Sequence, residues 1–162
     1  MSASLLTAPA FRRASARRAG RASRPAFRLG CDLCAIATVQ HATANFGSRY
    51  LQRIFTPHEL RDCQSEHGWR FCSLAARFAA KEATMKVLRL SPEQALPWSD
   101  IEIRRDRRGA PQLFLKGRAS ALARQAALAD WCVSLSHEAD YACATVLAVT
   151  TSRPRKPFHE PS

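Results

Sequence analysis

The chain has 162 residues and a mass of 18.0 kDa, which is enough for one domain with an ordinary hydrophobic core. Hydrophobic residues make up 46% of it and charged residues 23%, and these proportions exclude a chain that is disordered throughout. The longest mostly apolar run, residues 142–149, is far shorter than the roughly 20 residues of a membrane-spanning helix, so a membrane span is excluded as well.

The excess of basic charge lies mostly near the two ends of the chain. The formal net charge is +12, but residues 1–29 hold seven arginines and no acidic residue, while residues 30–150 carry only +3. An Arg-rich and Ser-rich start without acids is typical of a mitochondrial or plastid transit peptide, and a misassigned start codon gives the same composition. We expect an extension at residues 1–29, a folded domain at 30–150 and a flexible tail at 151–162. A cytoplasmic location follows unless the extension directs the protein to an organelle.

The first half of the domain predicts a strand followed by three helices. Residues 30–33 open a short apolar strand, and apolar residues recur at helical spacing over residues 46–55. Thr56 is followed at once by proline and three residues later by Glu59, which is the start signal of the next helix. The same helical spacing over residues 71–90 predicts the longest helix of the chain.

The second half predicts strands joined by tight turns, with one more helix between them. In chain order we expect a hairpin at residues 101–115 with its turn at 106–109, an Ala-rich helix at 117–128, and strands at 132–136 and 141–149 joined by a polar turn at 137–140. Helices combined with hairpin-linked strands indicate an α+β fold with an antiparallel sheet packed against helices. The last strand is apolar throughout, which predicts burial of both its faces.

The six cysteines include one CxxC pair, Cys31 and Cys34. No second pair lies at zinc-ligand spacing, so a zinc site lacks half of its ligands. Structural thiols in a reducing compartment are the first interpretation, and a redox protein that depends on Cys31 and Cys34 is the alternative.

Three residues offer a site for phosphate chemistry. Glu82 and Lys86 are four residues apart and share one face of the long helix. If the strand brings Asp32 close to Glu82, the two carboxylates can bind a hard cation such as Mg²⁺, and Lys86 can neutralise a diphosphate. Taken singly, Glu82 and Lys86 also fit a solvated surface pair, and Asp32 and His137 fit ordinary turn residues.

Four segments decide between these interpretations when they are taken together. They are GCDL at 30–33, RYLQRIFTPHE at 49–59, ARFAAKEATMK at 76–86 and VSLSHEADY at 133–141. In this order and spacing they resemble the holo-acyl-carrier-protein synthase type of 4'-phosphopantetheinyl transferase over residues 30–149. The resemblance implies an α+β trimer with active sites at its subunit interfaces.

The resemblance also implies an activity and its site. The reaction is Mg²⁺-dependent transfer of the phosphopantetheine arm of coenzyme A to a serine of an apo acyl carrier protein, which leaves 3',5'-ADP. The matching residues are Asp32 and Glu82 for the metal, Glu82 and Lys86 for catalysis, Lys86 and His137 for coenzyme A, and Arg49 and Arg53 for docking of the carrier protein. Carrier proteins are acidic, so a small basic patch would speed the encounter.

The chain departs from the family pattern at three places. The family has a glutamate and an arginine where this chain has Ala35 and Thr38, and often a Gly-rich loop where it has residues 87–92. In the family the glutamate supports the metal site, and the arginine belongs to the surface on which the carrier protein docks. A catalytically weakened paralogue is therefore one alternative. A basic nucleic-acid-binding protein is another, although most of the basic excess lies outside residues 30–150 and no stacking-aromatic motif is visible within them.

Overall fold

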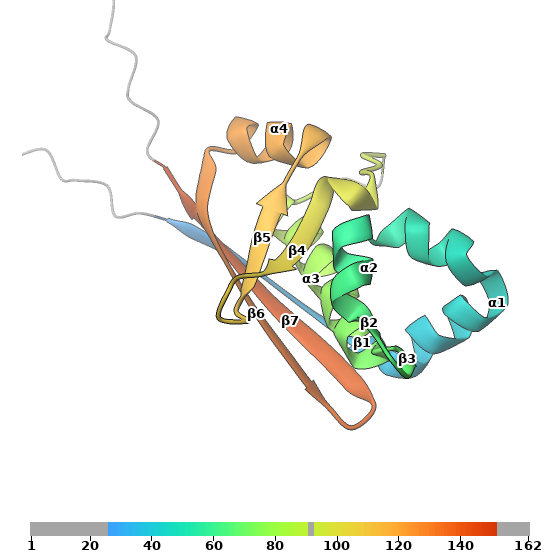
Figure 1. Cartoon of the computed structure of the whole chain (residues 1–162). Helices are drawn as coiled ribbons and strands as arrows, with labels where there is room; N and C mark the ends of the chain where they lie inside the picture. The colour runs from blue at the N-terminus through green and yellow to red at the C-terminus, as the bar shows by residue number, and fades with distance from the viewer. Residues whose placement is uncertain (1–25, 91–92, 152–162) are drawn as a thin grey trace, which may run out of the picture.

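The computed structural model describes residues 26–90 and 93–151 (Figure 1). The elements are β1 (Phe27–Ala35), α1 (Ile36–Ile54), α2 (Pro57–Cys63), β2 (Gln64–Ser65), β3 (Gly68–Trp69), α3 (Phe71–Leu88), a 3₁₀ turn (Trp98–Asp100), β4 (Ile101–Arg105), β5 (Pro111–Leu115), α4 (Gly117–Gln125), β6 (Leu128–Glu138) and β7 (Tyr141–Thr150). Nearly all of the expected extension and tail lies outside the described residues. The first strand begins at Phe27, three residues earlier than the sequence predicts. No helix in the described part of the chain is long and apolar enough to cross a membrane.

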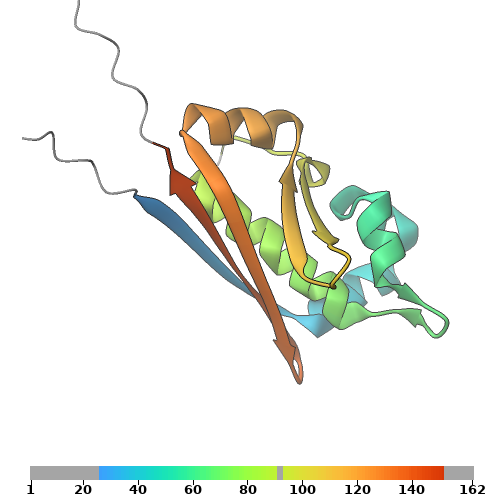
Figure 2. The same cartoon turned by 60° about the vertical axis from the view of Figure 1, so that its left-hand side comes forward.

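The main sheet is antiparallel, with strand order β1-β7-β6, and β4 and β5 form a separate hairpin. Figure 2 shows the helices gathered on one side of this sheet, with α3 lying along it. On that side β7 buries alternate residues, Ala142, Ala144, Val146 and Ala148. Within one chain the other face of β7 stays partly open, so burial of both faces, as the sequence predicts, would need a second copy of the chain.

Helix α3 is the centre of the core because small residues let it approach the sheet closely. Its alanines at 75, 76, 79, 80 and 83 are buried. At Gly30 on β1, an added Cβ would overlap the backbone carbonyl of Ala83. Only glycine therefore allows β1 to pass α3 at this distance, and the residues that follow Gly30 on β1 are brought beside the helix.

A buried polar network ties α2, α3 and β4 together. The predicted start of α2 is confirmed: the Glu59 amide donates to the Thr56 hydroxyl, and the Thr56 amide donates to the Glu59 carboxylate. Lys81 on α3 places its Nζ 2.9 Å from Glu59 Oε2. The Thr56 hydroxyl donates in turn to Glu102 on β4, over 2.9 Å. All four side chains are almost completely buried.

Further local predictions are wrong in their boundaries, among them the strand expected at 132–136, which is β6 and begins at Leu128. Helix α1 begins at Ile36, ten residues before the expected helix, and breaks at Gly47, whose φ of 57° and ψ of −140° are not helical. Its first half has too few apolar residues in register to be recognised, and only Val39 is buried there. His137 belongs to strand β6 and not to a turn, because Glu138 pairs with Tyr141 and leaves a two-residue hairpin turn.

Candidate active site

The structure brings Asp32, Glu82 and Lys86 together beside α3. Asp32 points from β1 toward the helix, and Lys86 places its Nζ 2.8 Å from Asp32 Oδ1. The same ammonium donates to the Cys31 carbonyl over 2.8 Å. Glu82 lies one helical turn before Lys86, close enough for the charges of Asp32 and Lys86 to act on it. As predicted, Asp32 on the strand therefore lies close to Glu82 and Lys86 on the helix.

The two carboxylates repel one another, and this shows in the pKa of Glu82. Burial raises the pKa of Glu82, the charge of Asp32 raises it further, and Lys86 lowers it only in part. The hydrogen bond to Asp32 raises the pKa of Lys86, so the ammonium stays charged. The site thus holds more negative charge than its own lysine neutralises.

This donor set fits Mg²⁺. The ion takes one or two carboxylates and fills its remaining positions with water and substrate phosphates. Among the described residues no group of three or more His, Cys, Asp or Glu side chains could hold a metal. An ion bound at Asp32 and Glu82 would therefore depend on water and substrate for its other ligands, as Mg²⁺ does.

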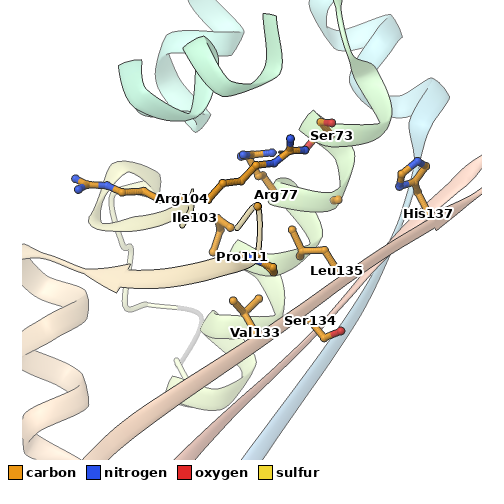
Figure 3. Close-up of a pocket in the computed structure, with 12 residues that line it drawn as sticks. Ser73, Arg77, Ile103, Arg104, Pro111, Val133, Ser134, Leu135 and His137 are labelled. Atoms are coloured by element: carbon orange, nitrogen blue, oxygen red, sulfur yellow. Dashed lines mark hydrogen bonds between the residues drawn. The ribbon is translucent and has the colours of Figure 1, made fainter. Parts of the chain in front are cut away.

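A pocket of about 280 Å³ lies between α3, β4 and β6 (Figure 3). Four cationic or titratable side chains line it: Arg77 from α3, Arg104 and Arg105 from β4, and His137 from β6. The Nε atoms of Arg77 and Arg104 are buried and have no hydrogen-bond partner in the part of the chain described. Because these two arginines bring positive charge to one pocket, the pocket is suited to an anion.

His137 is therefore not part of the carboxylate cluster in a single chain. It lies on β6, and Asp32 lies on β1, with β7 between them. The sequence named His137 but missed Arg77 and Arg104. An arginine inside an Ala-rich helix was the available signal for Arg77, because buried arginines need partners; Arg104, at the end of an alternating strand, gave no such signal.

The two arginines expected at the carrier-protein surface are exposed on the second half of α1. Phe46 and Tyr50 lie with Arg49 and Arg53 around a shallow hollow. Phe46 is 66% exposed, which is unusual for a large aromatic residue. Helix α1 contains no acidic residue.

The CxxC pair does not form a redox centre in this structure. Cys31 and Cys34 are three residues apart on a strand, so their side chains point to opposite faces. Cys31 is exposed and Cys34 is buried, and both are free thiols. Burial, and then Asp32 and Glu82, raise the pKa of Cys34, which makes it a poor thiolate.

Comparison with known proteins agrees with this geometry. Residues 28–146 match the profile of the 4'-phosphopantetheinyl transferase superfamily. A holo-acyl-carrier-protein synthase of Dehalococcoides mccartyi is 44% identical over 119 residues, which cover 74% of this chain and 95% of the relative. The chain belongs to the holo-acyl-carrier-protein synthase family. The predicted family and enzyme class, a phosphopantetheinyl transferase, are confirmed.

Further relatives and solved structures of this family support the same assignment. The Moorella thermoacetica synthase is 42% identical over 118 residues, covering 73% of this chain and 90% of the relative. A coenzyme A complex of the Chronobacterium ammoniagenes enzyme has a TM-score of 0.69 and 31% identity, covering 78% of this chain and 99% of that one. The Helicobacter pylori synthase, also in complex with coenzyme A, has a TM-score of 0.65 and 28% identity, covering 74% and 98%. The predicted α+β fold of this synthase family is thereby confirmed.

Proposed function

We propose that this synthase transfers the 4'-phosphopantetheine of coenzyme A to a serine of an apo acyl carrier protein, depends on Mg²⁺ and releases 3',5'-ADP. Its membership of the family and the coenzyme A complexes of its structural neighbours support the substrate. The observation that carries the proposal is the convergence of Asp32, Glu82 and Lys86 beside α3.

The reaction is a phosphoryl transfer, in which positioning and charge neutralisation lower most of the barrier. Asp32 and Glu82 would hold Mg²⁺, which when bound neutralises charge on the diphosphate of coenzyme A. Lys86 has three donors and a largely exposed ammonium beside the carboxylates. We propose that Lys86 stabilises the negative charge that develops on the leaving 3',5'-ADP. Glu82 would also orient a water that accepts the proton of the attacking serine.

The anion pocket is proposed as the coenzyme site. Coenzyme A carries phosphates on both sides of its ribose, and guanidinium groups bind phosphate oxygens through paired N–H donors. Arg77 and Arg104 both line this pocket. His137, which lines the same pocket from β6, is assigned to coenzyme A with them.

The outer face of the sheet is proposed as the subunit contact of a trimer. Phe27, Leu29, Leu33 and Tyr141 are between 52% and 67% exposed there. Contiguous exposed apolar surface on a folded domain marks an interface. Asp32 on β1 and His137 on β6 are separated by β7 within one chain. In a trimer, the coenzyme pocket beside each carboxylate cluster would therefore come from a neighbouring subunit. Analytical ultracentrifugation should give the mass of three chains, and a monomer would contradict this assignment.

The exposed arginines on α1 are proposed as the docking surface for the carrier protein. Helix α1 has no acidic residue that could pair with Arg49 or Arg53. Both arginines can therefore pair with acidic residues of the carrier protein. Such surface charges mainly speed association, and salt weakens their effect.

One experiment tests the proposed activity directly. The protein is mixed with Mg²⁺, coenzyme A and a panel of apo acyl carrier proteins, and the intact mass of each carrier is measured. One carrier should gain a single phosphopantetheine group. The gain should be lost with EDTA and in Asp32→Ala and Glu82→Ala. Glu66→Ala, which removes an exposed carboxylate from the β2–β3 turn, should leave it intact. A folded protein that modifies no carrier would contradict the proposal.

A further inference from the structure

Glu102 on β4 is a buried carboxylate with three donors around it. Only 1% of the residue is exposed. The Thr56 hydroxyl donates to Oε1 over 2.9 Å, and Arg104 Nη2 donates to Oε2 over 2.9 Å. Lys116 forms an ion pair with the same Oε2. Burial by itself would raise the pKa of Glu102, but these donors outweigh it and hold the pKa at about 2. The carboxylate therefore stays ionised at every physiological pH.

Of the two cations that share Oε2, only Arg104 reaches the anion pocket. Arg104 lines it, whereas Lys116 is not among the lining residues in the part of the chain described. Two further contacts fix the Arg104 side chain: its guanidinium carbon lies 4.7 Å from the centre of the Phe114 ring, and Nη2 is held by Glu102. The Arg104 side chain is nevertheless 36% exposed. One edge of the guanidinium is thus anchored while the side chain can still meet a ligand in the pocket.

Arg77 on α3, which also lines the pocket, is held in a similar way. Asp62 Oδ2 lies 3.1 Å from Arg77 Nη2, and the Ser73 carbonyl accepts from Nη1 over 3.4 Å. Its Nε is unpaired in the described part of the chain. Two guanidinium groups, each tied at one end by a carboxylate, therefore face one pocket. Fixing a side chain before the ligand arrives removes the entropy that binding would otherwise cost.

We infer that Glu102 is a positioning residue for coenzyme binding, which holds the Arg104 guanidinium in place to receive a phosphate group of coenzyme A. The inference rests on the proposed function of the anion pocket. Glu102 does not touch the coenzyme and acts only through Arg104. Asp62 has the corresponding relation to Arg77.

The test uses the full-length protein with three single variants and one double variant. The dissociation constant for coenzyme A is measured by calorimetry, together with KM for coenzyme A and kcat, and thermal unfolding confirms that each variant is folded. Arg104→Gln should weaken coenzyme A binding about tenfold, the value of one charge-assisted hydrogen bond. Glu102→Gln should weaken it about fivefold and raise KM, with kcat changed less than twofold.

Lys116→Gln is the matched control, because it removes the other cation from the same oxygen. It should leave coenzyme A affinity within about twofold of the parent protein. In the Arg104→Gln background, Glu102→Gln should add no further loss, since the residue it positions is already gone.

The outcomes separate this inference from the proposed function. If the parent protein binds no coenzyme A, both are overturned. If the parent protein binds but Arg104→Gln binds equally well, the inference alone fails, and this test holds even if Glu102→Gln does not fold. The inference also fails if Lys116→Gln weakens binding as much as Arg104→Gln, or if the Glu102→Gln effect persists in full in the double variant.

Discussion

Neighbouring residues of α3 end in two opposite electrostatic environments. Lys81 is fully buried and has a carboxylate partner and two carbonyl acceptors, from Trp98 and Ile101. Glu82, the next residue, faces Asp32, and its pKa is raised. Every charge of the buried network has an oppositely charged partner, whereas the carboxylate pair at the surface has one lysine for two negative charges.

The difference shows how the same residue types serve stability in one place and chemistry in the other. In the network, each buried charge has donors or acceptors that offset much of its lost hydration, although burial still lowers the pKa of Lys81. At Asp32 and Glu82 part of the negative charge is left without compensation, and a metal ion with its bound substrate can supply it. A carboxylate whose pKa is raised by burial and by a specific neighbouring charge, as that of Glu82 is, is typical of functional sites.

The largest expected effect is on stability and distinguishes two lysines of one helix. Lys81→Met leaves Glu59 as a buried unpaired charge, so the free energy of unfolding should fall by about 3–5 kcal/mol. Lys86→Met removes a pair whose lysine is 53% exposed, and should cost under about 1 kcal/mol. Urea unfolding measures both. Equal losses would remove the distinction between network and site.

Glu82→Gln should have opposite effects on activity and stability. Transferase activity should fall by about 100-fold or more, as on removal of one electrostatic contact to the transition state. Because the folded pKa of Glu82 is raised, its ionised form destabilises the metal-free protein at neutral pH. Unfolding of the metal-free variant should therefore require slightly more free energy, by a few tenths of a kcal/mol. A variant that is both active and less stable would contradict the account.

The low pKa of Glu102 predicts how the stability of the protein changes at acid pH. Its folded pKa of about 2 lies below that of the unfolded chain, so its contribution is present above the unfolded value and is lost as the pH falls from about 4.5 toward 2. The contribution is on the order of 3 kcal/mol. Urea unfolding across this range should show a shallower decline in Glu102→Gln than in the parent protein. Parallel pH profiles would show that Glu102 is not the group responsible.

The smallest effect is expected at the docking surface. Thr38 is exposed in the first turn of α1, where the family has an arginine. Thr38→Arg should raise kcat/KM for an acidic carrier protein by about threefold at low salt, and the gain should vanish at high salt. Thr38→Gln, of similar size but neutral, is the control. A gain that survives high salt would show that the added charge is not its cause.

The sequence was sufficient to predict those elements and contacts that depend on local residue patterns and on the order of the elements along the chain. The Thr56–Glu59 cap, the long helix and the hairpins follow from residue types and periodicity. The meeting of Asp32 with Glu82 and Lys86 was predicted because a helix face and a strand can be aligned once their order is known.

The rest depends on contacts between residues far apart in the chain. Glu102 and Thr56 are 46 positions apart, and nothing in the local sequence around either residue predicts the hydrogen bond between them. Arg104 became a pocket residue only when β4 was placed against α3 and β6. The first half of α1 was missed because its burial is slight.

Metal binding tests the central claim most directly, namely that the uncompensated carboxylate pair is the site of chemistry. Mg²⁺ is titrated calorimetrically into the protein with coenzyme A present, and then into Asp32→Asn, Glu82→Gln and Glu66→Gln. The account predicts binding to the parent protein and to Glu66→Gln, and its loss in the other two variants. Unchanged Mg²⁺ affinity in folded Asp32→Asn and Glu82→Gln would contradict it.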